Sequence, residues 1–210
     1  MFDLEEQEKV DALKTWWKRH GNTVALAVTV LAAAVVGIQG WRYYQSNQAR
    51  QAAALYDALQ GTMQAGNAEN IRSVAGQLLE KYPRTGYAAR AALISAKANY
   101  EAGDAKSARA QLQWAVEHAE EAPLRDMARL QLAGILLDEK HYDGALQLLN
   151  AEHGAAYGAL YDDLKGDVLV AQGKPDQARA PYLAALQKLG EKSPYRKLVQ
   201  IKLDALGEAK

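Results

Sequence analysis

The sequence has 210 residues, in which 25 lysines and arginines balance 25 aspartates and glutamates, and it contains no cysteine. A formal net charge of zero provides no basic field that would hold nucleic acid, so we expect no nucleic-acid partner. The lack of cysteine excludes a disulfide framework, a thiol nucleophile and a cysteine-ligated metal site. A composition rich in alanine, leucine and glutamine, with a single phenylalanine, favours helices over sheets.

The first twenty residues are typical of a short amphipathic helix. Val10, Leu13 and Trp17 are spaced so that they share one helix face. We expect residues 1–20 to be a cytoplasmic segment that extends a membrane anchor along the inner leaflet. A docking helix for a cytoplasmic partner is the alternative interpretation.

Residues 21–41, GNTVALAVTVLAAAVVGIQGW, carry no charge and are long enough as a helix to cross the hydrocarbon core of a bilayer. A helix also satisfies every backbone polar group within the segment, as lipid requires. We therefore predict a transmembrane helix over residues 21–44. A cleaved signal peptide, with small residues at 31–34, and a buried core helix are the alternatives. The apolar run continues beyond residue 34 and covers all faces, which favours the membrane anchor.

Aromatic and basic residues flank the apolar segment on both sides, as is typical of segments that lie in the headgroup region. These expected membrane-interface residues are Trp16, Trp17, Lys18, Arg19, Trp41, Arg42, Tyr43 and Tyr44. Basic residues are more numerous on the N-terminal side of the span. This bias predicts a single pass with a cytoplasmic N-terminus and a large domain, residues 45–210, on the other side of the membrane.

The chain after residue 44 reads as a series of helices separated by turn signals. Leu55, Leu59 and Met63 continue the first helix as a stalk over residues 45–65, which we expect to end at residues 65–67. Glycine and proline positions predict further helices over 70–82, 87–102, 105–121, 124–139, 144–151, 157–171 and 175–189, with a last helix after Pro194. No alternating run predicts a strand.

These helices form pairs that repeat. The turn within a pair begins at Gly103, Lys140 and Gly173, at intervals of 37 and 33 residues. A small residue follows five positions after each turn, namely Ala108, Ala145 and Ala178. A helix–turn–helix unit with a period near 34 residues is the tetratricopeptide pattern, in which small residues let the paired helices approach closely. We predict an all-α fold: one N-terminal transmembrane helix, a tetratricopeptide-like α-solenoid of about three to four helix pairs, and a C-terminal capping helix.

Several segments of the chain are distinctive: the charged N-terminal helix, WRYY at 41–44, KYPRTGYA at 81–88, ARLQLAGILL at 128–137, GDVLVAQGKPDQARAPYLAAL at 166–186 and KLDAL at 202–206. In these segments the chain resembles a known family, the ancillary subunit of the bacterial SecYEG translocon or YfgM-like family. The resemblance implies anchoring in the inner membrane beside the translocon and a periplasmic domain. It also implies interaction with a membrane-anchored periplasmic prolyl isomerase-like chaperone, and it offers no catalytic residues.

No arrangement of residues predicts catalysis, a metal site or a cofactor, so we expect no enzyme. The four histidines, at 20, 118, 141 and 153, lack metal-ligand spacing. No phosphate-binding loop or hydrolase motif is present. Asp163 and Asp167 share one helix face, but a catalytic carboxylate pair would need an apolar pocket. The favoured interpretation of these two residues is a solvated or partner-facing acidic face.

In tetratricopeptide arrays the first helix of each pair lines the concave face. The candidate groove residues on this face are Ile94, Ala98, Gln131, Ile135, Asp163 and Asp167. These positions lack the lysine, arginine and asparagine that would clamp a C-terminal carboxylate, so we expect an apolar or basic segment to bind there. The favoured function is an inner-membrane adaptor at the Sec translocon that binds periplasmic chaperones or newly exported, unfolded proteins. The alternative is a membrane-anchored scaffold or assembly factor for another envelope complex.

Overall fold

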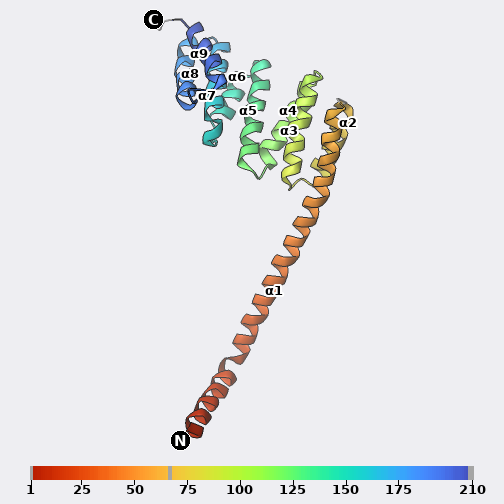
Figure 1. The fold of residues 1–210 in the computed structure, drawn as a ribbon, viewed down its shortest axis with the longest axis vertical. Coiled ribbons are helices and arrows are strands. Elements are labelled where there is room, and N and C mark those ends of the chain that lie inside the picture. Colours follow the sequence, from red (N-terminus) through yellow and green to blue (C-terminus); the bar gives the residue numbers. More distant parts are fainter. Residues whose placement is uncertain (1, 66–67, 208–210) are drawn as a thin grey trace. The chain divides into compact units, whose positions relative to one another are not determined.

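The computed structural model describes residues 2–65 and 68–207, with side chains from residue 9 onward. Within these residues the chain is helical and contains no strand, as predicted (Figure 1). The helices are α1 (Phe2–Gln64), α2 (Ala68–Lys81), α3 (Gly86–Glu101), α4 (Ala105–His118), α5 (Ala122–Asp138), α6 (Tyr142–Leu149), α7 (Gly158–Ala171), α8 (Pro175–Lys188) and α9 (Pro194–Ala205), with a short 3₁₀ helix at Ala155–Tyr157. The chain divides into two compact units, Met1–Gln48 and Ala49–Lys210.

The first unit consists of α1 as far as Gln48. We predict a short amphipathic helix over residues 1–20; residues 2–20 are helical, and they continue through Gly21 into the apolar segment as one helix. Of the described helices, α1 is the one long and apolar enough to cross a bilayer, by length and composition. Its apolar side chains are exposed on all sides; Leu26 and Leu31 are each 66% exposed and Val36 is 71% exposed.

The second unit is a tetratricopeptide-like array of helix pairs. Each helix from α2 to α9 packs against the next, and α3 also contacts α5, as α5 does α7. The pairs α3/α4, α5/α6 and α7/α8 are the three predicted repeats, and α9 packs on α8 as the predicted capping helix. The end of α1 contributes to this unit, since Ala52 and Leu59 are completely buried in a cluster with Ile71 and Leu78 of α2. The predicted end of this helix at residues 65–67 lies partly outside the described residues.

The turns within the three pairs have one backbone conformation. Gly103, Lys140 and Gly173 have positive φ values of 83°, 62° and 80°. After each of them, the next backbone N–H reaches a carbonyl five residues back: Asp104 to Asn99 at 2.8 Å, His141 to Leu136 at 2.7 Å, and Lys174 to Leu169 at 2.9 Å. A left-handed residue and this bond close a helix end in the Schellman motif. The repeat therefore fixes the same turn geometry even where lysine replaces glycine.

Small residues set the spacing of the paired helices. Ala108, Ala145 and Ala178 are completely buried. At Gly166 of α7 the approach is close, because a Cβ atom built there would lie 2.3 Å from the ring of Tyr182 on α8. The small and large positions of the repeat thus fit together as the sequence pattern predicts.

Candidate partner-binding groove

Two hollows flank α3 on the repeat unit. The first hollow, about 430 Å³, lies between α3 and the segments that precede it, and Ile94 and Ala98 are among its lining residues. The second hollow, about 310 Å³, lies between α3 and α5, and Gln131 and Ile135 are among its lining residues. The structure thus places four of the six predicted groove residues on these two hollows. Lys97 borders both.

The sequence of α3 explains its close packing. Ala88, Ala91 and Ala92 are completely buried, so that neighbouring helices approach its backbone closely. Its first turn is capped by Thr85, whose side-chain oxygen accepts a hydrogen bond from the backbone N–H of Ala88 at 3.3 Å. The hollows therefore lie beside a helix that is fixed at its start and along its length.

A buried polar network fixes the register of α3 against α4. Gln111 of α4 donates to the Ser95 hydroxyl and accepts from the Asn99 amide, both at 2.8 Å. Arg72 of α2 donates to the Asn99 carbonyl oxygen at 3.3 Å. Ser95 and Asn99 are completely buried, and fully satisfied networks of this kind favour one arrangement of the helices.

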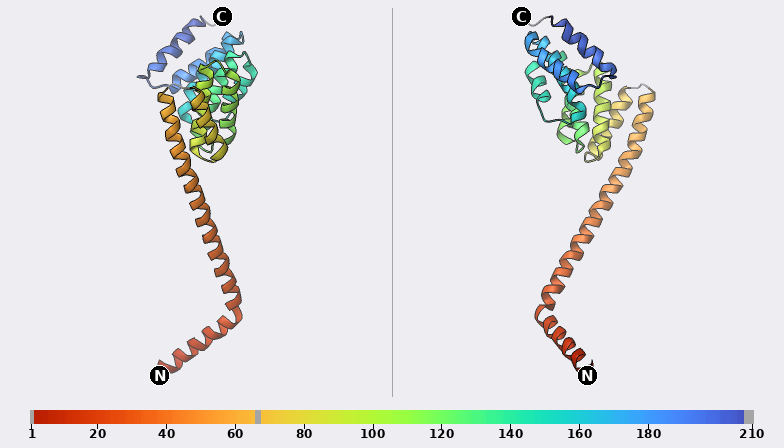
Figure 2. Two further views of the ribbon diagram at one scale, coloured as in Figure 1. Left: turned by 90° about the vertical axis from the view of Figure 1, so that its right-hand side faces the viewer. Right: turned by 60° about the vertical axis from the view of Figure 1, so that its left-hand side comes forward.

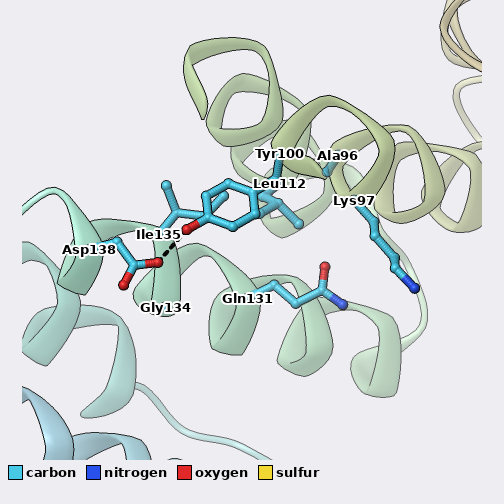
Figure 3. Close-up of a pocket in the computed structure, with 8 residues that line it drawn as sticks. All are labelled: Ala96, Lys97, Tyr100, Leu112, Gln131, Gly134, Ile135 and Asp138. Atoms are coloured by element: carbon cyan, nitrogen blue, oxygen red, sulfur yellow. Dashed lines mark hydrogen bonds between the residues drawn. The ribbon is translucent and has the colours of Figure 1, made fainter. Parts of the chain in front are cut away.

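The second hollow has an apolar floor and polar ends. Figure 3 shows the hydrogen bond from Tyr100 to Asp138 at one end and the polar groups of Lys97 and Gln131 at the other. The bond to Asp138 raises the pKa of the Tyr100 hydroxyl above its usual value. The charged residues on the two hollows are Lys97, Asp138 and Glu101, so the acids outnumber the base. Sequence reasoning did not assign Lys97, Tyr100 or Asp138 to the groove, although their spacing from Ile94 and Ile135 put them within reach.

The interpretation of Asp163 and Asp167 as a solvated or partner-facing acidic face was wrong for Asp163, which is buried, whereas Asp167 is paired with Lys202 and keeps 28% exposure. The Asp163 side chain is 2% exposed, because Lys202 of α9 covers it. The Lys202 ammonium lies 3.0 and 2.9 Å from the two Asp163 oxygens and 2.6 Å from Asp167. Tyr195 donates to Asp163 at 2.5 Å, and Tyr182 donates to Asp167 at 2.8 Å. The capping helix therefore occupies this part of the expected groove.

This cluster changes the ionisation of its members. Burial, together with the hydrogen bonds to Asp167 and Asp163 respectively, raises the pKa of Tyr182 and Tyr195. Burial alone would lower the pKa of Lys202, but the hydrogen bonds to Asp167 and Asp163 outweigh it and raise that pKa. The cluster is thus a charge-paired structural contact, and the hollows beside α3 are the candidate binding surface. Within the described residues no group of three or more histidines and carboxylates is arranged to hold a metal ion.

Comparison with known proteins identifies relatives along almost the whole chain. A family model described as a tetratricopeptide repeat-like domain matches residues 14–208. A Neisseria gonorrhoeae protein named "Ancillary SecYEG translocon subunit" is 32% identical over 207 residues, which cover 97% of this chain and 98% of that protein. Proteins of the same name from Haemophilus influenzae and Escherichia coli are 31% and 26% identical, and the alignments cover 89% and 87% of this chain and 91% and 87% of those proteins.

Proposed function

The chain belongs to the family of ancillary SecYEG translocon subunits, and from that premise we propose that it is an inner-membrane-anchored adaptor at the Sec translocon. In this proposal its helical-repeat domain binds periplasmic chaperones or newly exported, unfolded proteins. The observation that supports the binding role most directly is the pair of hollows along α3. The repeat domain follows a helix whose residues 21–41 are apolar on all faces. The role requires no catalysis and no cofactor.

The character of α1 supports the anchor. Residues 21–41 expose their apolar side chains on every side, which is costly in water and favourable in lipid. Trp16, Trp17, Trp41 and Tyr43 are also exposed near the two ends of this segment, where aromatic residues favour the headgroup region. The helix over residues 21–44 would then be the transmembrane span.

The basic residues around the span support the orientation. Lys9, Lys14, Lys18 and Arg19 precede it, whereas only Arg42 and Arg50 closely follow it. Basic residues are retained on the cytoplasmic side of a membrane. The proposed N-terminus is therefore cytoplasmic, and the repeat domain is periplasmic.

The chemistry of the hollows supports an apolar or basic ligand. Each hollow has the volume of a small ligand pocket and is lined mainly by apolar atoms. Lys97 lies 3.7 Å from Glu101, whereas Asp138 forms no ion pair among the described residues, so the uncompensated charge of the groove is negative and disfavours a carboxylate ligand. An extended segment of an exported protein, or of a membrane-anchored prolyl isomerase-like chaperone, would place its large side chains in the two hollows.

In-cell photocrosslinking tests this proposal. A photoreactive residue at Val36 would report neighbours of the span, and one at Lys97 or Gln131 would report ligands of the hollows. Gln113, exposed on α4 and absent from the lining of either hollow, is the matched control. We expect translocon subunits at Val36, and a periplasmic chaperone or exported chains at Lys97 and Gln131 but not at Gln113.

Other outcomes of the crosslinking would contradict particular parts of the proposal. An unrelated envelope complex at all sites would support a scaffold or assembly factor instead. Cytoplasmic partners at Gln131 would reverse the proposed orientation. Equal capture at Gln131 and Gln113 would show that the hollows have no special role in binding.

A further inference from the structure

The capping helix α9 has no second helix beside it in the described part of the chain. Each earlier first helix, such as α5 or α7, is followed by a helix that completes its pair. α9 packs on α8 as the first helix of a further pair would, at the C-terminal edge of the array (Figure 2). In the described part of the chain, the side of α9 turned away from α8 is exposed.

The two sides of α9 differ in burial. Val199 and Leu203 are buried in a cluster with residues of α7 and α8. Leu198 and Ile201 are 46% and 56% exposed, and Ala205 is also exposed. Leu198, Ile201 and Ala205 are separated by three and four residues, which is the spacing of apolar residues along the seam between two packed helices.

The charges beside this seam are of opposite sign. Lys197 and Asp204 are exposed, lie seven residues apart on the same side of α9, and form no ion pair within residues 68–207; Asp204 accepts a hydrogen bond from Gln200 at 2.7 Å through one of its two oxygens. When two identical helices pack antiparallel around a two-fold axis, the start of each faces the end of the other. Lys197 of each copy then faces Asp204 of the other copy. This helix face is consequently complementary to itself in both shape and charge.

We propose that the open face of α9 binds α9 of a second copy of the chain as an antiparallel two-fold pair. Leu198 and Ile201 form its centre, and two Lys197–Asp204 pairs flank them. A foreign partner with a single sign of charge would oppose one of the two residues, whereas a second copy satisfies both. One helix face gives a small interface, so the pair is weak in dilute solution and is strengthened when both copies are confined to one membrane.

Cysteine crosslinking of the full chain in membranes tests this pairing, because the chain has no cysteine of its own. Ile201→Cys places a thiol near the proposed two-fold axis, and Gln113→Cys on the exposed side of α4 is the control for random collisions. We expect oxidation to produce a disulfide-linked dimer from Ile201→Cys and not from Gln113→Cys. Equal yields from the two variants would overturn the proposal.

Charge reversal in the Ile201→Cys chain tests the register. Either Lys197→Asp or Asp204→Lys alone places like charges opposite each other at both ends of the proposed α9 interface. Each exposed charge pair changes the association constant by up to about fivefold. The double variant restores opposite charges, so we expect it to regain the crosslink that each single variant loses. Failure to regain it, with all variants equally stable to heat, would overturn the antiparallel arrangement. A crosslink from residue 201 to a different protein, in place of the dimer, would overturn the choice of partner.

Discussion

Replacement of Lys202 by methionine tests whether α9 is held by its ion pairs. In the described part of the chain Lys202 is the cation in contact with Asp163, a carboxylate only 2% exposed. Removing one partner of a buried ion pair leaves the other charge desolvated and costs about 3–5 kcal/mol. The Lys202 side chain is 25% exposed, so water partly screens the pair. We therefore expect a loss at the lower end of this range, about 3 kcal/mol of the free energy of unfolding.

Two further variants separate charge from packing. Lys202→Met combined with Asp163→Asn and Asp167→Asn leaves no buried charge, so we expect it to recover most of the loss. Lys192→Met changes an exposed lysine with no ion pair in the described structure, and we expect it to stay within about 0.5 kcal/mol of the original chain.

Urea unfolding of residues 49–210 is the assay. In this fragment Trp114 is the single tryptophan, so its fluorescence reports α4 while circular dichroism reports all helices. With a urea slope of about 2 kcal/mol/M, a 3 kcal/mol loss lowers the midpoint by about 1.5 M. If α9 detaches first, dichroism will show an early transition that Trp114 does not report. A Lys202→Met variant as stable as the original chain, or a triple variant no better than the single, would refute the reasoning.

The same cluster predicts loss of stability at alkaline pH. The pKa of Lys202 is raised from 10.5, so the folded state holds this proton more tightly than the unfolded state. Its contribution is complete below pH 10.5 and is lost as the pH rises through the raised value. Tyr182 and Tyr195 act in the same direction, starting from 10.0. The stability difference between the original chain and Lys202→Met should therefore be constant from pH 7 to 9 and should shrink above about pH 10.5.

Three other substitutions probe the repeat architecture by thermal or urea unfolding. Lys140→Gly relieves a left-handed lysine with φ 62° and should stabilise the domain by about 1 kcal/mol; no gain would contradict the strain argument. Gly166→Ala places a Cβ atom 2.3 Å from the buried Tyr182 ring and should cost about 1–3 kcal/mol, whereas a neutral result would mean that the helices separate freely. Asp126→Ala removes the carboxylate, 3% exposed, that accepts from the Gly154 N–H at 2.9 Å, and should cost about 1–3 kcal/mol; unchanged protection of that amide from hydrogen exchange would show that the bond is dispensable.

The sequence was sufficient for the features that depend on local chemistry. Most helix ends followed from glycine and proline positions to within two residues, although α4 ends at His118 and not at residue 121. The alignment of Lys140 with Gly103 and Gly173 identified a turn where no glycine stands. The repeat spacing also placed Ile94 and Gln131 on the helices that border the hollows. Each of these features depends on residues close in sequence, or on one helix face, and periodicity reports both.

The features that were missed depend on which helix covers which face. Asp163 and Lys202 are 39 residues apart, and periodicity places each on a helix face without indicating that the two faces meet. Lys97 was overlooked because an exposed lysine on a helix is usually solvated. Its spacing from Ile94 indicated the same helix face, but the positions of α2 and α5 are what make it border both hollows. Tertiary neighbours of this kind become known when the helices are placed in space.

The neighbour-to-neighbour packing of the array has a consequence for the order in which the domain forms. Nearly all contacts between its helices join elements adjacent in sequence, so each pair gains its stabilising surface as soon as the next helix arrives. A chain delivered from its N-terminus would then fold progressively as it emerges. The step that completes it is the arrival of Lys202, which neutralises the carboxylates already present on α7. Pulse-labelled hydrogen exchange during refolding should show α3 and α4 protected before α9, and simultaneous protection would indicate one cooperative step instead.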